Sequence, residues 1–204
     1  MSKKELNSQV EKFSYSIGLS VASNLIGSGI KTIDAEAFNM AIEDAYAGQM
    51  PQISPDEANQ IIQEYISRVQ DSEKDQNLNS GNAYLAENKK KKHIQELPSG
   101  MQFEVMVQGD GELPTTSDNV KCHYHGTLID GTVFDSSVQR GEPAVFPVNG
   151  VIQGWQEALQ LMPVGSKWRL FIPPHLAYGE NGAGGVIEPN TTLVFEVELL
   201  EIVN

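Results

Sequence analysis

The sequence has little cysteine, little positive charge and no long apolar segment. The single cysteine, Cys122, cannot form a disulfide within the chain, which fits a reducing compartment. Acidic residues number 27 against 14 basic ones, and the formal charge is −13. Such a surface repels phosphate backbones and anionic lipids, so neither nucleic acid nor a membrane is an expected partner. No stretch approaches the roughly 18 apolar residues of a membrane-spanning helix.

No apolar run of signal-peptide length follows the basic residues at the N-terminus, where the sequence reads MSKKELNSQVEKFSYS. The default expectation is therefore a cytoplasmic protein. This expectation holds only if the chain is not a processed mature form.

Glycine and proline are unevenly distributed and divide the chain. Residues 1–97 contain five glycines and two prolines, whereas residues 98–204 contain thirteen and eight. Both tryptophans lie in the second half, which also carries most of the negative charge. A shift of this kind indicates two domains of different construction.

The first half has the apolar spacing of three helices. Asp34 is a candidate N-cap for the second helix, and Ser54, Pro55 and Glu57 form a capping-box signature for the third. Glycines and a proline end the first two. The apolar stripes are Phe13, Ile17, Val21 and Leu25, then Phe38, Ala41, Ile42 and Ala45, and then Ala58, Ile61, Ile62, Tyr65, Ile66 and Val69.

Beyond Val69 the pattern becomes polar. We predict a continued, mostly solvated helix that ends between Asn88 and Lys92, with a disordered linker as the alternative because Gly81 weakens a helix. The predicted organisation is a helical dimerisation domain over residues 1–70, a long helix or linker over 71–97 and a second domain over 98–204. Short helices with narrow stripes bury little within one chain, so two copies should pair. A monomeric helical cap on the second half is the alternative.

The second half has the period-two alternation of strands separated by glycine and proline turns. One alternating set is Val120, Cys122 and Tyr124, with Lys121, His123 and His125 on the opposite face. Residues 151–161 break the pattern, because their apolar residues recur at helical spacing. The predicted fold class is α+β, an antiparallel sheet with one short helix across it.

Several reactive motifs are weighed and set aside. His123 and His125 share one strand face, but a metal site needs three or four ligands, so two exposed polar residues are the better interpretation. Alternation turns Cys122 away from both histidines, which favours a buried apolar residue over a nucleophile. Residues 179–185 are rich in glycine but lack the Lys-Ser or Lys-Thr of a phosphate loop. No serine lies in a G-x-S-x-G motif.

What remains is a set of aromatic residues with almost no ionisable group among them. For any single aromatic residue a place in the core is the better interpretation. One carboxylate, Asp135, directly follows an aromatic residue. The set is Tyr124, Phe134, Phe146, Trp155, Tyr178 and Phe195.

The motifs around these aromatics resemble those of the FKBP-type peptidyl-prolyl cis-trans isomerases. They are HYHGTLIDGTVFDSS (123–137), VIQGWQEALQLMPVGSKW (151–168), LAYG (176–179) and TLVFEVELL (192–200), in the order and spacing of that family. The helical first half is similar to the Mip-like (macrophage infectivity potentiator) bacterial subgroup. That likeness implies a homodimer joined through the N-terminal helices and, here, the cytoplasmic branch.

The resemblance implies a five- to six-stranded sheet around a short helix and a pocket on it. Tyr124, Asp135, Ile152, Tyr178 and Phe195 are the implied catalytic residues. Tyr178 and the Ile152 N–H would bind substrate carbonyls, and Asp135 would act as an orienting group bonded to Tyr124. The implied substrate-binding residues are Phe134, Arg140, Phe146, Val151, Trp155, Ala183, Val186 and Ile187, with Arg140 pairing with Asp135.

The implied activity is rotation about X–Pro bonds in partly folded proteins, with no metal or cofactor. Clients would bind to the helical domain, and macrolide inhibitors of the family would bind in the pocket. A non-catalytic chaperone or adaptor that holds proline-containing segments is the alternative. Departures from the family pattern on the rim, such as Ala144 and Glu188, bear on substrate preference and inhibitor affinity.

Overall fold

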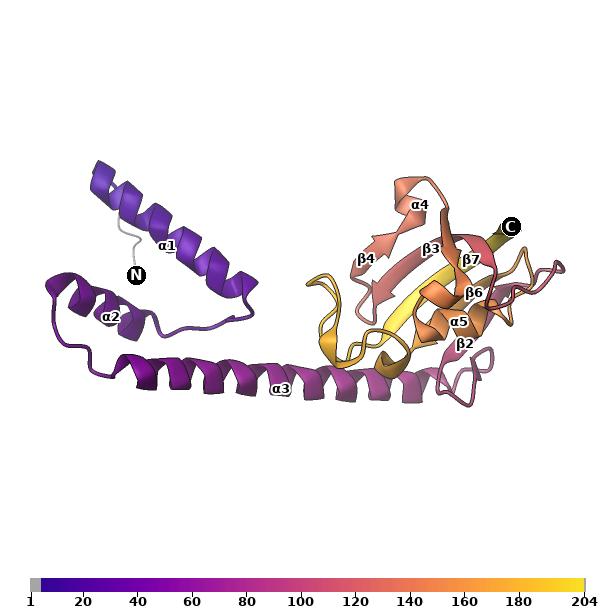
Figure 1. Cartoon of the computed structure of the whole chain (residues 1–204), viewed down its shortest axis with the longest axis horizontal. Coiled ribbons are helices and arrows are strands. Elements are labelled where there is room, and N and C mark those ends of the chain that lie inside the picture. Colours follow the sequence, from indigo (N-terminus) through magenta and orange to yellow (C-terminus); the bar gives the residue numbers. More distant parts are fainter. Residues whose placement is uncertain (1–4, 204) are drawn as a thin grey trace. The chain divides into compact units, whose positions relative to one another are not determined.

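The computed structural model describes residues 5–203 and contains two compact units, one ending at Arg68 and the other beginning at Val69. Figure 1 traces the chain from three helices into a sheet domain. The third helix, α3, spans the boundary between the units. Within residues 5–203, no helix combines the length and the apolar character needed to cross a bilayer.

The first unit consists of α1 (Gln9–Gly27), α2 (Ala35–Ala47) and the first part of α3 (Pro55–Asn88). Each helix begins at a side chain that accepts hydrogen bonds from free backbone N–H groups. The Asp34 carboxylate caps α2, as expected, and the Ser54 hydroxyl accepts from the Glu57 N–H at the start of α3. A capping box at Ser8 begins α1, and this cap was not predicted.

The helical unit has no buried residue anywhere between residues 5 and 68. Its apolar stripes are present but exposed to solvent. Phe13 in α1 is 65% exposed, and apolar side chains of α2 and α3 are exposed as well. The three helices are therefore amphipathic as predicted, but residues 5–68 do not bury the apolar side chains of these helices. A single copy of this unit lacks the apolar core that stabilises small domains.

The helix α3 continues without a break to Asn88, as predicted, and no disordered linker follows Val69. The expectation that this part is mostly solvated is wrong for one face, where Gly81, Leu85 and Asn88 are buried. Gly81 costs helix propensity but permits close packing. A Cβ at that position would lie 2.2 Å from Thr192 Oγ1. The close packing of the helix on the sheet domain at Gly81 outweighs the low helix propensity of glycine.

The second unit is built on one antiparallel sheet of seven strands. The strand order is β1-β2-β6-β7-β3-β4, with β5 paired to β3 beside β4. The expected count of five to six is exceeded because β1 has only two residues and β5 lies off the main path. The strands are β1 (Gln95–Glu96), β2 (Gln102–Val107), β3 (Asn119–Leu128), β4 (Val133–Ser136), β5 (Ala144–Pro147), β6 (Lys167–Ile172) and β7 (Leu193–Val203).

The short helix α5 (Gln153–Leu159) lies across one face of this sheet, as predicted (Figure 1). Trp155 and Leu159 are buried between the helix and the strands. Gly154 allows the approach, since a Cβ there would lie 2.6 Å from Ile172 Cγ2. Four short helical turns complete the unit: α4 (Ser137–Arg140), η1 (Val148–Gly150), η2 (Pro174–Leu176) and η3 (Gly179–Asn181).

A buried pair of amides joins α3 to the edge of the sheet. Gln102 and Asn88 are each 1% exposed, and Asn88 Nδ2 donates to Gln102 Oε1 at 3.0 Å. Gln102 Nε2 donates in turn to the Leu85 carbonyl at 3.0 Å and to the Glu96 carboxylate at 2.9 Å. Buried amides of this kind stabilise a structure only while all partners are present.

We expect Gln102→Leu to lower the free energy of unfolding of the second unit by about 1–3 kcal/mol, because it leaves the buried Asn88 Nδ2 without its acceptor and removes one of the two hydrogen bonds to the Leu85 carbonyl. Tryptophan fluorescence during urea unfolding measures this unit, since both tryptophans lie in it. The control is Gln108→Leu at an exposed position, where we expect little change. Equal stabilities of the two variants would contradict the assigned role of Gln102.

Candidate active site

The strand β3 places the first site residue by simple alternation. Its residues from Val120 onward are alternately buried and half-buried, which turns Tyr124 toward the core side of the sheet. The Ser137 hydroxyl then fixes this point of the strand: it accepts from the Tyr124 N–H at 2.7 Å and donates to the Tyr124 carbonyl at 3.2 Å. The backbone of Tyr124 is thereby tied to the first residue of α4, two residues after Asp135.

Three polar side chains form a closed network at the edge of the site. The Tyr124 hydroxyl donates to Asp135 Oδ2 at 2.5 Å and accepts from an Arg140 nitrogen at 2.7 Å. Arg140 also forms an ion pair with Asp135. The single turn α4 makes this pairing possible, because it brings Arg140 back over Tyr124. The predicted contacts of Asp135 with Tyr124 and Arg140 are both present.

This network holds Asp135 in its charged form. Partial burial raises the pKa of Asp135, but hydrogen bonds from Tyr124 and Arg140, with the positive charge of Arg140, lower it below the ordinary value. The pKa of the Tyr124 hydroxyl is raised by burial and by its hydrogen bond to Asp135. At neutral pH neither group is prepared to exchange a proton. Asp135 therefore serves as a fixed acceptor.

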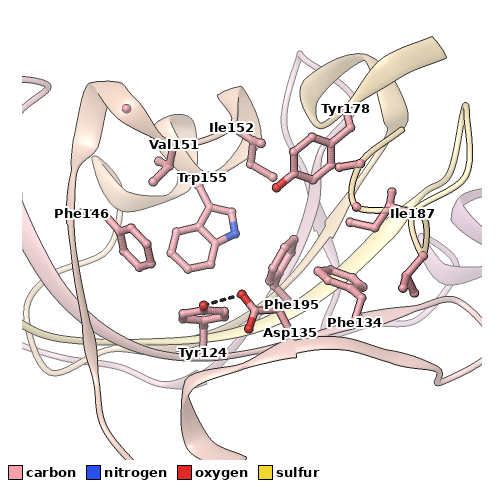
Figure 2. Close-up of a pocket in the computed structure, with 14 residues that line it drawn as sticks. Tyr124, Phe134, Asp135, Phe146, Val151, Ile152, Trp155, Tyr178, Ile187 and Phe195 are labelled. Atoms are coloured by element: carbon pink, nitrogen blue, oxygen red, sulfur yellow. Dashed lines mark hydrogen bonds between the residues drawn. The ribbon is translucent and has the colours of Figure 1, made fainter. Parts of the chain in front are cut away.

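Trp155 is the centre of the aromatic set (Figure 2). Three rings pack against it edge to face: Tyr124 at 5.5 Å, Phe146 at 5.8 Å and Phe195 at 5.3 Å between centroids, each within 10° of perpendicular. Phe134 packs in the same way on Phe195, at 5.3 Å. The rings hold one another in place and form a rigid apolar floor.

Above this floor lies a cavity of about 490 Å³, a size suited to a small ligand or a peptide segment. The structure brings twelve of the thirteen expected site residues into its wall. Arg140 is the exception, because it lies behind Asp135 rather than on the wall. The lining is Tyr124, Phe134, Asp135, Phe146, Gly150, Val151, Ile152, Trp155, Tyr178, Ala183, Gly184, Val186, Ile187 and Phe195.

Glycines are the part of the site that sequence reasoning missed. Gly150 and Gly184 line the cavity but were not expected there. Gly126, two residues after Tyr124, lies on the same strand face, and a Cβ on it would lie 2.7 Å from the Phe134 ring and 2.8 Å from Phe195. A strand glycine that follows a buried aromatic was an available signal for this close approach.

Two hydrogen-bond donors of the cavity are unoccupied. Among residues 5–203, neither the Tyr178 hydroxyl nor the N–H of Ile152 has an acceptor. Ile152 is the N-cap of α5, where a free N–H is expected from helix geometry. Figure 2 shows the Tyr178 hydroxyl directed toward the cavity, across from Tyr124 and Asp135. Both donors can therefore bind carbonyl groups of a ligand.

The residues that first look reactive lie outside this cavity. Cys122 is fully buried, and burial raises the pKa of its thiol to about 12, so the thiolate is not formed. The expectation that His123 and His125 are exposed is wrong in part, because both are half-buried and hydrogen-bonded to Ser137 and Ser136. No group of three or more potential metal ligands occurs in the described part of the chain.

Comparison with known proteins places this geometry in a family. The model for the FKBP-type peptidyl-prolyl cis-trans isomerase domain matches residues 110–200, and that for the domain amino terminal to it matches residues 10–105. The FKBP-type 22 kDa peptidyl-prolyl cis-trans isomerase of Escherichia coli is 53% identical over 193 residues, 93% of each chain. This chain belongs to the FKBP-type peptidyl-prolyl cis-trans isomerases. Its activity is the isomerisation of X–Pro bonds, which was expected ahead of the non-catalytic chaperone or adaptor.

Two further relatives extend over both units of this FKBP-type isomerase. The peptidyl-prolyl cis-trans isomerase Mip of Coxiella burnetii is 42% identical over 204 residues, 97% of this chain and 88% of that protein. The crystal structure of FkpA from Escherichia coli matches with a TM-score of 0.75 and 35% identity, over 97% of this chain and 98% of that one. The expected α+β fold, helical first and sheet second, is confirmed.

The Asp135 network predicts that the pKa of Asp135 shifts measurably when Arg140 is replaced. Because its folded pKa lies below 3.8, Asp135 stabilises the fold above that pH, and the contribution is lost as the pH falls through the lower folded value. We expect Arg140→Gln to raise the folded pKa of Asp135 toward its ordinary value, so that this contribution becomes smaller and its loss is complete at a higher pH. Carboxyl-carbon NMR measures it. Asp130 is the internal control, since its pKa is lowered by hydrogen bonds from Thr132 instead. An unchanged Asp135 titration would contradict the network.

Proposed function

We propose that the cavity over Trp155 is the catalytic site and that it works by binding the twisted X–Pro bond. The observation that supports this most directly is the combination of an aromatic floor with two free donors, Tyr178 and the Ile152 N–H. The one carboxylate in the wall is already paired with Arg140. Nothing in such a site performs acid, base or nucleophilic chemistry.

The reaction needs none of these. Rotation about an X–Pro bond meets a barrier of roughly 20 kcal/mol because the amide loses its partial double-bond character in the twisted state. The carbonyl becomes less polar as the bond twists. An apolar site therefore disfavours the planar amide more than the twisted one, and it need form no covalent bond.

The proposed roles follow from where the side chains lie. Trp155 would form the floor under the proline ring, with Phe146 and Phe195 beside it. Tyr178 and the Ile152 N–H would hold the carbonyl groups that flank the bond in an orientation favourable to rotation. Asp135 would hold the Tyr124 hydroxyl in place without moving a proton. Macrolide inhibitors of the family are expected in the same cavity.

We expect Tyr178→Phe to lower kcat/KM for a proline-containing peptide about two- to tenfold, the effect of losing one hydrogen bond of roughly 0.5–1.5 kcal/mol. The Tyr178 ring remains, so the cavity keeps its shape. The matched control is Tyr84→Phe, which removes a hydroxyl in the same unit but outside this cavity. Equal activity of the two variants would count against the assigned role of Tyr178.

We further propose that the helical unit joins two copies of the chain. The support is the absence of any buried residue in the part of it that the structure describes, together with its exposed apolar stripes. A second copy would cover these stripes, and a C2 pairing would do so for both chains at once. The similarity to Mip and FkpA extends through this unit.

The same unit is proposed to hold client proteins. An apolar groove of about 390 Å³ runs along α2 and the segment after it, lined by Met40, Ala41, Ala45, Pro51 and Ile53 among others. Apolar segments of partly folded chains fit a groove of this chemistry. A client captured there would be held near an isomerase cavity on the same chain, which raises its effective concentration at that cavity.

Ile17 and Leu113 provide a matched test of the pairing. Ile17 lies in the apolar stripe of α1 and is 48% exposed, and Leu113 is 53% exposed in the sheet unit. We expect Ile17→Asp to weaken dimerisation at least tenfold, since a buried charge costs more than the 1.4 kcal/mol that a tenfold change requires. Leu113→Asp should keep the wild-type mass in light scattering, twice the chain mass of 22.4 kDa. A wild-type mass of one chain would contradict the proposal.

The same pair separates client binding from catalysis. If the paired helices hold clients, Ile17→Asp slows the refolding of a proline-limited protein and leaves short-peptide isomerisation unchanged. Equal loss on both substrates would contradict a separate role for the helices. A cytoplasmic location remains a prediction from the sequence, and cell fractionation tests it.

A further inference from the structure

One wall of the cavity is a short glycine-rich segment. Ala183, Gly184, Val186 and Ile187 all contribute to it. Two backbone hydrogen bonds between Ala183 and Ile187, of 2.8 and 3.0 Å, close the segment on itself. Gly184 and Gly185 both have positive φ angles, 60° and 72°. These bonds shape the wall, but they do not by themselves fix its position over the floor.

The residues that follow, 188–192, link this wall to β7. The Thr191 hydroxyl donates to the Glu188 carbonyl at 2.7 Å, and the Asn190 N–H donates to the Gly179 carbonyl at 2.8 Å. Asn190 has a φ of 57°, a left-handed conformation that no other non-glycine residue in the described chain adopts. The segment is therefore compact, and a shift at one end is transmitted to Ile187 at the other.

The second part of α3 contacts this linking segment at both ends. Asn77 Nδ2 donates to the Pro189 carbonyl at 3.0 Å and to the Glu188 carboxylate at 3.2 Å. One turn further on, Gly81 packs directly on Thr192, with room for no Cβ. Asn77 and Gly81 are four residues apart, so they lie on the same face of the helix. All of these residues belong to the second compact unit.

The contact at Thr192 is made by shape rather than by hydrogen bonding. Thr192 is 2% exposed, and within residues 5–203 its buried hydroxyl has no hydrogen-bond partner. A Cβ on Gly81 would lie 2.2 Å from Thr192 Oγ1 and 3.1 Å from Thr192 Cβ. Any side chain at position 81 therefore displaces the start of β7 or the helix itself.

We propose that Asn77 and Gly81 of α3 are positioning residues for the substrate cavity. They act through residues 188–192 on the wall formed by residues 183–187 and touch no substrate themselves. This proposal rests on the proposed function, because it takes the cavity over Trp155 as the substrate site. The wall would contact bound substrate, whereas the two donors assigned to the carbonyl groups, the Tyr178 hydroxyl and the Ile152 N–H, lie outside residues 183–187. A displaced wall therefore raises KM and leaves kcat nearly unchanged.

The first test replaces Asn77 by Asp in the full-length chain. The carboxylate cannot donate to the Pro189 carbonyl, and it repels the Glu188 carboxylate. We expect KM for a proline-containing peptide to rise about three- to tenfold, in keeping with the loss of a hydrogen bond, while kcat changes less than twofold. Asn79→Asp is the matched control, because it makes the same charge change at an exposed position about 200° around the helix.

The second test uses a compensating pair. Gly81→Ala raises helix propensity but pushes against Thr192, so KM should rise as in Asn77→Asp. Adding Thr192→Ala removes the hydroxyl that the new methyl group meets. The double variant should return KM to within about twofold of wild type, the signature of direct coupling in a double-mutant cycle. A merely structural role would change the unfolding temperature without this rescue.

The possible outcomes distinguish a failure of the positioning role from a failure of the proposed function. If the wild-type chain turns the peptide over and neither Asn77→Asp nor Gly81→Ala changes KM, the positioning role is wrong and the proposed function is unaffected. If KM rises in both but the double variant stays impaired, coupling through Thr192 is wrong. If the wild-type chain has no activity, the proposed function itself fails.

Discussion

The structure of the catalytic unit depends on the edge-to-face packing of three rings on Trp155. Tyr124 comes from β3, Phe195 from β7 and Phe146 from β5, so the indole of α5 contacts three strands at once. Edge-to-face contacts fix orientation as well as distance. The short helix is therefore located on the sheet by the same rings that form the floor of the cavity. The same residues therefore serve packing and cavity alike, because the rings that stabilise α5 also form the apolar floor of the cavity.

The few charges near the cavity are arranged so that they take no part in proton transfer. Asp135 is held ionised by Arg140 and Tyr124, and the Tyr124 hydroxyl is held protonated by burial and by Asp135. In a hydrolytic enzyme such groups would be tuned toward neutral pH. Here their pKa values are moved away from it. This is what bond rotation requires, since the twisted amide gains from an apolar, pre-shaped site and from fixed donors rather than from acid or base.

The helical unit and α3 have different relations to this site. Residues 5–68 leave their apolar stripes exposed and bury no side chain of their own. The part of α3 from Val69 onward is integrated into the sheet unit through Gly81, Tyr84 and Asn88. One continuous helix thus begins in the unit proposed to pair and ends in the catalytic unit. Gly81, in the C-terminal part of this helix, leaves the room that close packing on Thr192 needs.

Much of the local structure and of the site could be predicted from the sequence, since it depends on periodicity, capping and motif spacing. The caps of α2 and α3, the inward face of β3 and the aromatic set follow from neighbouring residues alone. The burial of Gly81 and the hydrogen bonds of His123 could not be predicted, because their partners are more than ten residues away in the chain. The sequence by itself determined which side chains could build an apolar, non-reactive cavity. Only the tertiary structure decided that α3 contacts the segment leading to one wall of it, because strand order and helix docking bring together residues that no local pattern connects.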